Sequence, residues 1–219
     1  MLNPKAFLPR PIVLVACLII LEIFIFFLPE HIYSWVLKEN GPIENASVAG
    51  YLLGAILVSY IGFKNKVSNH YLSAGLLIGL ALRELDFHTR FTTMGIFKTR
   101  FYISSEVPIQ EKVIASIVIA ILIISLIFYL IKNIQAFLES MHRRRTWAIS
   151  VCIAILLAVL SKTFDRCNEE IDNFTTNYLG LSTEKILQIS EETFELAIPV
   201  FILLAIAHCM FDQSQRPTE

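Results

Sequence analysis

Charged residues are scarce in this sequence, and neither sign dominates. Only 17% of the 219 residues are charged, whereas 55% are hydrophobic, a balance too apolar for an ordinary soluble domain. The formal net charge is −1 and no half of the chain is strongly basic, so we do not expect nucleic acid as a partner. The composition instead predicts a protein whose main solvent is lipid.

The short motifs of familiar catalytic and metal sites are also missing. The four cysteines form no CxxC or other zinc-type spacing. HExxH and GxSxG are absent, which excludes a zincin-type metalloprotease and a hydrolase with the usual nucleophile elbow. A di-iron carboxylate bundle needs two Glu-x-x-His pairs, and the chain offers only Glu84 and His88, four residues apart. No motif therefore names a reaction.

Long apolar runs are what the sequence does contain. A bilayer core about 30 Å thick needs roughly 20 helical residues, and runs near that length recur along the chain. The expected spans cover residues 11–29, 45–63, 68–88, 112–131, 147–163 and 193–211. The sequence thus predicts an all-α fold, a polytopic transmembrane helical bundle of about six spans, forming a single membrane domain over residues 1–219.

The third run is the weakest of these spans. Its purely apolar part extends only from Tyr71 to Leu82, which gives roughly 18 Å of helix at 1.5 Å per residue. Either residues 68–88 form a half-helix, or their charged end lies within the membrane.

Lysine and arginine in the short loops predict the orientation. With six spans, both termini share one side with the 64–68 turn and the 132–146 loop, which carries the run Arg143, Arg144, Arg145. We therefore expect both termini to be cytoplasmic. The other side also carries cations, many of them beside acids. We expect a multi-pass protein of a bacterial inner (plasma) membrane.

Small residues indicate where helices approach each other. Gly50 with Gly54 and Gly75 with Gly79 form small-xxx-small pairs on the second and third spans, which predicts that these two spans pack together. The alternative is that glycine is simply frequent in membrane helices. In the sixth span, Pro199 lacks an N–H and is expected to loosen the helix just after Glu195.

Ionisable residues gather at one predicted level, near the outer ends of four spans. They are Glu22 on the first span, Arg83, Glu84, Asp86 and His88 on the third, Lys162, Asp165 and Arg166 on the fifth, and Glu191, Glu192 and Glu195 on the sixth. A charge within hydrocarbon costs about 2.5 to 3.5 kcal/mol on insertion scales, so chance placement is a poor explanation. Snorkelling and mutual pairing explain Arg90, Arg166 and Glu191, but they explain Glu22 poorly because apolar residues flank it on both sides.

Helical periodicity sorts these residues into pairs. Residues four apart share a face, which predicts that Glu84 lies beside His88 and Glu191 beside Glu195. Two carboxylates held close together repel each other when both are ionised, so one of them can bind a proton more readily. His88 can orient a divalent metal through one ring nitrogen, so Glu84 and His88 are a tentative metal site.

The leading hypothesis is an acidic and histidine-containing pocket at the exoplasmic (periplasmic) face of the membrane. It would belong to a hydrolase or transferase, with a divalent metal as a possible cofactor, that acts on membrane lipid or a lipid-linked substrate. The predicted catalytic residues are Glu84, His88, Asp165, Glu191 and Glu195, the predicted phosphate-binding residues are Arg83, Arg90 and Arg166, and Glu22 is the deepest carboxylate. Whether the protein is an enzyme stays open.

Two alternatives use the same residues. In a small proton- or cation-coupled transporter, the glutamates form a relay or a cation site. In a non-catalytic subunit, the polar level docks a membrane-protein partner or a second copy of the chain.

The outer loop after the third span has the composition of a membrane interface. It interleaves aromatic residues such as Phe91, Phe97 and Tyr102 with Lys98 and Arg100. The loop is either an ordinary aromatic belt or a lid that recruits an anionic lipid.

Overall fold

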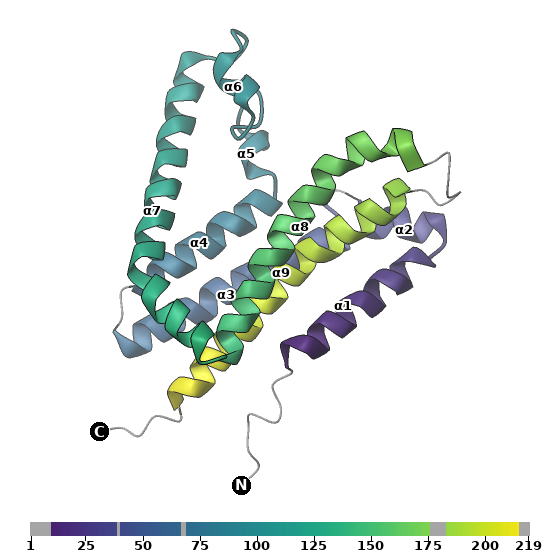
Figure 1. Ribbon diagram of the computed structural model, residues 1–219. Helices are drawn as coiled ribbons and strands as arrows, with labels where there is room; N and C mark the ends of the chain where they lie inside the picture. Colours follow the sequence, from purple (N-terminus) through teal and green to yellow (C-terminus); the bar gives the residue numbers. More distant parts are fainter. Residues whose placement is uncertain (1–9, 39, 67–68, 176–182, 215–219) are drawn as a thin grey trace. The chain divides into compact units, whose positions relative to one another are not determined.

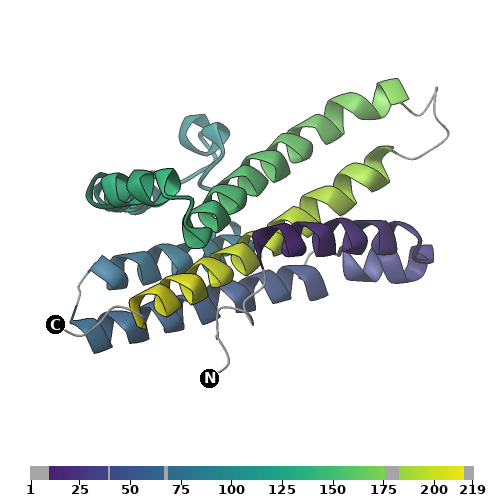
Figure 2. The same ribbon diagram turned by 60° about the horizontal axis from the view of Figure 1, so that its bottom comes forward.

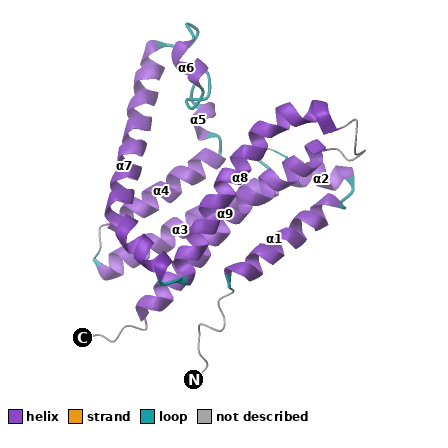
Figure 3. Cartoon of the chain, in the orientation of Figure 1, coloured by secondary structure: helices purple, strands orange, loops and turns teal. Residues whose placement is uncertain are grey.

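The computed structural model describes residues 10–38, 40–66, 69–175 and 183–214, and in these ranges it contains helices and no strand (Figure 3). The expected all-α fold is therefore confirmed. The helices are α1 (Pro11–Phe26), α2 (Glu30–Val36), α3 (Pro42–Asn65), α4 (Asn69–Glu84), α5 (Phe87–Arg90), α6 (Thr99–Ile103), α7 (Ile109–His142), α8 (Thr146–Thr175) and α9 (Thr183–Ser214).

Several of these helices are suited to crossing a membrane. Among the described residues, four segments are both long and apolar enough: Pro42–Asn65, Ile109–His142, Thr146–Arg166 and Lys185–Asp212. Helix α1 is apolar but has only 16 residues, and α4 also has 16, or roughly 24 Å each. The helices are thus consistent with a multi-pass membrane protein, while the count of about six spans remains a prediction.

The chain divides into two compact units, which are described separately. The first unit comprises Met1–Gly50 and Ser140–Glu219, and the second comprises Tyr51–Glu139. In the first unit α8 and α9 run antiparallel and side by side, and α1 packs along α9 (Figures 1 and 2). That residues 1–219 form a single domain in the membrane stays a prediction.

Small and apolar residues recur along the buried side of α8. Ser150, Ala154, Leu157 and Ser161 are all buried, at spacings of three or four residues that place them on one face of the helix. Small side chains allow helix backbones to approach closely, which suits the long contact between α8 and α9.

An apolar cluster joins the ends of α1 and α9 to the α2–α3 region. Ile25, Leu37, Ile43 and Ile189 are buried together, contributed by α1, the end of α2, α3 and α9. The chain enters α1 and α3 at Pro11 and Pro42, and proline is favoured in the first helical turn because its missing N–H has no helical partner there.

Gly50 marks a close approach of α3 to α9. A Cβ atom added to Gly50 would lie 2.9 Å from the Cβ of Pro199, which is fully buried. The predicted glycine packing between the second and third spans stays a prediction. Around Gly75 no described atom lies within 4 Å of an added Cβ, and at Gly79 the nearest such atom is a methyl of Leu122 on α7, at 3.9 Å.

The third predicted span ends earlier than the sequence suggested. Helix α4 stops at Glu84, and Asp86 adopts a left-handed conformation (φ 49°) before the short helix α5 begins. Aspartate tolerates this conformation better than most residues because its side chain is short and polar. A single helix over residues 68–88 is therefore wrong at its end, and Glu84 and His88 do not form a pair within one helix.

Candidate functional site

Three carboxylates converge on one lysine where the C-terminal half of α8 packs beside the N-terminal half of α9. The Lys162 Nζ lies 3.1 Å from Asp165 Oδ2, 3.4 Å from Glu195 Oε1 and 4.0 Å from Glu191 Oε1. We call these four residues the Lys162 cluster. The cluster carries one formal positive charge and three formal negative charges, so it has an excess of negative charge.

Helical spacing explains why these side chains meet. Asp165 follows Lys162 by three residues on α8, and Glu191 and Glu195 are four residues apart on α9. Since α8 and α9 are antiparallel neighbours, the C-terminal half of α8 faces the N-terminal half of α9. Sequence spacing thus places each pair on one helical face, and helix packing brings the two pairs together.

The cluster is open to its surroundings on one side. The side chains of Lys162 and Asp165 are 46% and 51% exposed, whereas those of Glu191 and Glu195 are 20% and 17% exposed. On the buried side, the Ser161 hydroxyl donates a hydrogen bond to Glu195 Oε1 at 3.1 Å, and Ser161 itself is 1% exposed. Glu195 therefore contacts a fixed buried donor and a partly exposed ammonium group.

Glu22 joins α1 to the same stretch of α9. The Thr193 hydroxyl lies 3.1 Å from Glu22 Oε1 and 2.7 Å from the Ile189 carbonyl oxygen. Thr193 is fully buried and lies between Glu191 and Glu195 in the sequence. The isolated carboxylate of α1 thus has a hydroxyl partner on α9.

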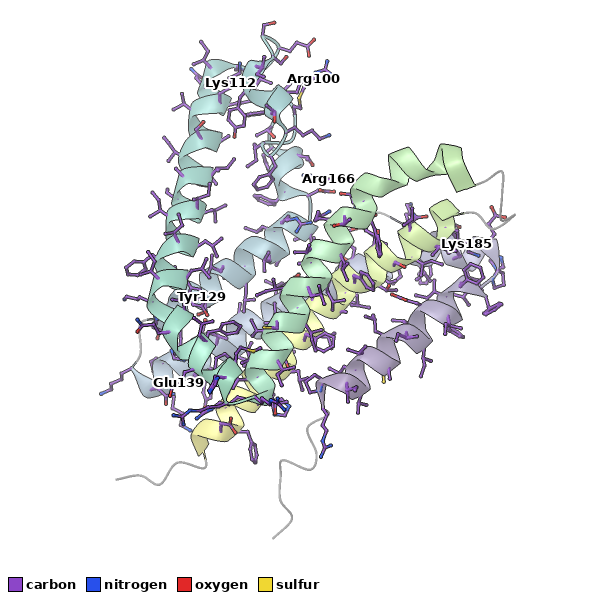
Figure 4. All side chains as sticks on the ribbon, in the orientation of Figure 1. Arg100, Lys112, Tyr129, Glu139, Arg166 and Lys185 are labelled. Carbon is purple, nitrogen blue, oxygen red and sulfur yellow. The ribbon has the colours of Figure 1, made fainter. Side chains whose placement is uncertain are left out.

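A lysine at the start of α9 binds the C-terminal end of α1. The Lys185 Nζ donates to the Phe26 carbonyl oxygen at 3.0 Å and lies 5.2 Å and 4.7 Å from the ring centroids of Phe26 and Tyr33 (Figure 4). A cation at a helix C-terminus is stabilised by the negative end of the helix dipole. The Tyr33 hydroxyl in turn donates to Gln188 Oε1 at 2.6 Å, which ties α2 to α9.

An open, largely apolar pocket lies between α1 and α9. It has a volume of about 250 Å³ and is lined by Glu22, Ile23, Phe26, Phe27, Ile186, Ile189 and Ser190. Glu22 is the only titratable side chain in this lining. The walls are apolar apart from the Glu22 carboxylate and Ser190.

The predicted site residues fall into two groups. In the first unit, the structure brings together Asp165, Glu191 and Glu195 and places Glu22 against Thr193, while Arg166 is exposed on α8 (Figure 4). In the second unit, Glu84 is buried in the last turn of α4, with an exposed fraction of 8%, and Arg83 is half-buried. The side chains of His88 and Arg90 lie outside the part of the chain that the structure describes.

The predicted metal pair Glu84 and His88 stays a prediction, because the His88 side chain is among those not described. Among the side chains that are described, no group of three or more His, Cys, Asp or Glu residues is arranged to hold a metal ion. Where the acids of α8 and α9 do converge, Lys162 provides the positive charge.

Sequence reasoning missed two polar partners and gave a third no role. Ser161 and Thr193 each donate a hydrogen bond to a predicted carboxylate, but neither was singled out. Lys162 was placed at the predicted polar level beside Asp165, but it was given no part in the site. A signal for each was present: a hydroxyl or ammonium group within an apolar run needs a polar partner, because water is scarce there.

Comparison of the chain with models of protein families, with curated proteins and with solved structures found no match.

Proposed function

We propose that the protein is a small proton- or cation-coupled membrane transporter that uses the Lys162 cluster as its cation site. The observation that carries this proposal is the convergence of three partly exposed carboxylates on one ammonium group. Such a site already holds a cation, the lysine side chain. A proton or a small cation can compete with Lys162 for the same carboxylates, which is the exchange that coupling requires.

A second feature of α9 supports this proposal. Pro199 has no N–H, so the helical hydrogen bond from residue 199 to the Glu195 carbonyl cannot form. Interrupted backbone bonding beside a polar site is typical of transporter helices that bend or bind ions with their carbonyls. Here the interruption falls on Glu195, a member of the cluster.

The proposal includes the orientation that the loops predict. The chain crosses the membrane about six times, with α1 and α4 as the shorter spans and both termini in the cytoplasm. The Lys162 cluster then faces the exoplasmic or periplasmic side, as expected for a bacterial inner-membrane protein. After the four native cysteines are replaced by serine, Asp165→Cys and Arg143→Cys are exposed to a membrane-impermeant thiol reagent. Only Asp165→Cys should react from outside.

Flux in liposomes tests the transport function. The full-length protein is reconstituted with a pH-sensitive dye inside, and Na⁺, K⁺ and Mg²⁺ are added outside in turn. We expect at least one cation to change the internal pH, and Glu195→Gln to reduce that response at least tenfold. Glu30→Gln, at an exposed carboxylate on α2, is the matched control and should behave as the wild type. No response to any cation in the wild type would contradict the proposal.

A second candidate is a hydrolase or transferase that acts on a lipid or lipid-linked substrate. The apolar pocket beside Glu22 favours it, since the pocket suits an acyl chain and Glu22 is a candidate general base. Mass spectrometry of lipids incubated with the protein would detect turnover, which Glu22→Gln should abolish. The metal-dependent form rests on Glu84 and His88, and elemental analysis should then find a divalent metal that is lost in Glu84→Ala and His88→Ala.

A further inference from the structure

The segment between α5 and α7 is folded against the beginning of α7. We call residues 91–108, which include α6, the capping loop. Its residues Ile96, Phe101 and Val107 are buried together with Ala115 of α7, and Phe101 is completely buried (Figure 1). The capping loop therefore has an apolar core of its own that attaches it to α7.

The two charged residues of the first turns of α7 fix the capping loop in place. Glu111 accepts hydrogen bonds from the Thr93 backbone N–H and the Thr93 hydroxyl, each at 3.0 Å. The Lys112 Nζ donates to the Ser104 carbonyl oxygen at 2.7 Å. Both charged residues of the first turns of α7 are thus bonded within the unit and hold the loop at two points.

The outer surface of the capping loop combines exposed apolar side chains with two cations. Phe91, Phe97 and Ile103 are 70%, 57% and 78% exposed. Lys98 and Arg100 are also exposed, and within the described part of the chain neither side chain makes a hydrogen bond or an ion pair. Figure 4 shows Arg100 at the same end of α7 as Lys112.

The position of the capping loop along α7 gives this surface a partner. Helix α7 is the most apolar of the candidate spans, and its apolar run begins at Val113, directly after Lys112. The capping loop therefore lies where α7 enters the lipid. Lysine and arginine are usually enriched in cytoplasmic loops, whereas the capping loop is predicted to lie on the outer side. A binding role would explain why Lys98 and Arg100 occur there without partners in the described part of the protein.

We propose that the capping loop is a binding surface for the anionic headgroups of the surrounding bilayer. Phe97 and Ile103 lie at the boundary between headgroups and acyl chains, and Lys98 and Arg100 bind lipid phosphate. This role is independent of transport at the Lys162 cluster and uses none of its residues.

Hydrogen exchange of the backbone amides tests the proposal in the intact protein. The full chain is placed in nanodiscs of phosphatidylcholine alone or with about one-third phosphatidylglycerol, a fraction typical of an anionic membrane surface. We expect peptides covering residues 97–108 to exchange at least threefold more slowly in the anionic discs. In Lys98→Gln/Arg100→Gln this difference should disappear. Lys64→Gln/Lys66→Gln, at the exposed end of α3, is the matched control and should keep the difference.

Two control measurements test whether the double variant is folded and whether free phosphate can replace the lipid surface. Peptides covering residues 113–131 report whether the double variant still folds, and their protection should stay unchanged. Inorganic phosphate added to phosphatidylcholine discs should not slow exchange in the capping loop, since a bilayer surface is the proposed ligand. Equal exchange in both disc types for the wild type, or slowing by free phosphate alone, would overturn the proposal. An unchanged lipid response in Lys98→Gln/Arg100→Gln would do so as well.

Discussion

The Thr193 hydroxyl of α9 lies within hydrogen-bond distance of Glu22 Oε1 on α1 and of two carbonyl oxygens of its own helix, those of Ile189 and Ser190. A hydroxyl has one proton, so it donates to only one of these oxygens at a time. When it donates to a carbonyl, its lone pairs can accept a hydrogen bond from the O–H of a neutral Glu22. The Glu22–Thr193 contact is therefore compatible with both charge states of a carboxyl group in an otherwise apolar stretch.

Removing the Thr193 hydroxyl should loosen α1 from α9. In Thr193→Val we expect a loss of about 0.6 to 1.5 kcal/mol in unfolding free energy, the range of hydrogen bonds between membrane helices. Thermal unfolding in detergent would show this as a lower Tm. Thr193→Ser keeps the hydroxyl and should lose much less. A Tm for Thr193→Val equal to that of Thr193→Ser would show that the hydroxyl contact does not stabilise the protein.

Removing the positive charge of the Lys162 cluster should destabilise the contact between α8 and α9. In Lys162→Met three carboxylates remain without their ammonium partner, and we expect a loss of about 1 kcal/mol at neutral pH, limited by the partial exposure of Lys162. Adding Glu195→Gln removes one of the repelling charges and should restore part of the lost stability. If the double variant is less stable than Lys162→Met, repulsion among the carboxylates is not the cause.

Gly50 and Gly75 should respond differently to the same substitution. In Gly50→Ala the new methyl group would lie 2.9 Å from Pro199, so either α3 or α9 must move, and we expect a lower Tm. In Gly75→Ala the methyl group meets no described atom within 4 Å, and the better helix propensity of alanine favours an unchanged or higher Tm. Equal Tm changes in both variants would contradict the close approach of α3 to α9.

Lys185 should contribute to the attachment of α1. In Lys185→Met the apolar stem is kept, but the bond to the Phe26 carbonyl and the contacts with the Phe26 and Tyr33 rings are lost. We expect a loss of about 1 to 2 kcal/mol in unfolding free energy, because an amine-to-carbonyl bond and a cation–π contact are both removed. Lys38→Met, at an exposed lysine after α2, is the control and should have little effect. Similar losses in both variants would mean that general charge, and not the α1 contact, is responsible.

The amino-acid sequence predicted the helical fold well, because that fold depends on local properties. Long apolar runs require every backbone polar group to bond within its own segment, and the α-helix is the structure that does so. The predicted runs at 45–63, 112–131, 147–163 and 193–211 accordingly fall within α3, α7, α8 and α9. The end of the third run was less predictable, because nothing in the apolar pattern marks the left-handed conformation of Asp86.

The pairing of polar side chains was decided by the tertiary structure. Sequence spacing placed Glu191 and Glu195 on one face of a helix, since residues four apart share a face. It did not reveal that Lys162 and Ser161 bind Glu195, or that Thr193 binds Glu22 from 171 residues away. Helix formation follows from neighbours along the chain, whereas these contacts depend on which faces of α1, α8 and α9 meet. That choice is made by the close packing of small and apolar side chains from distant parts of the sequence.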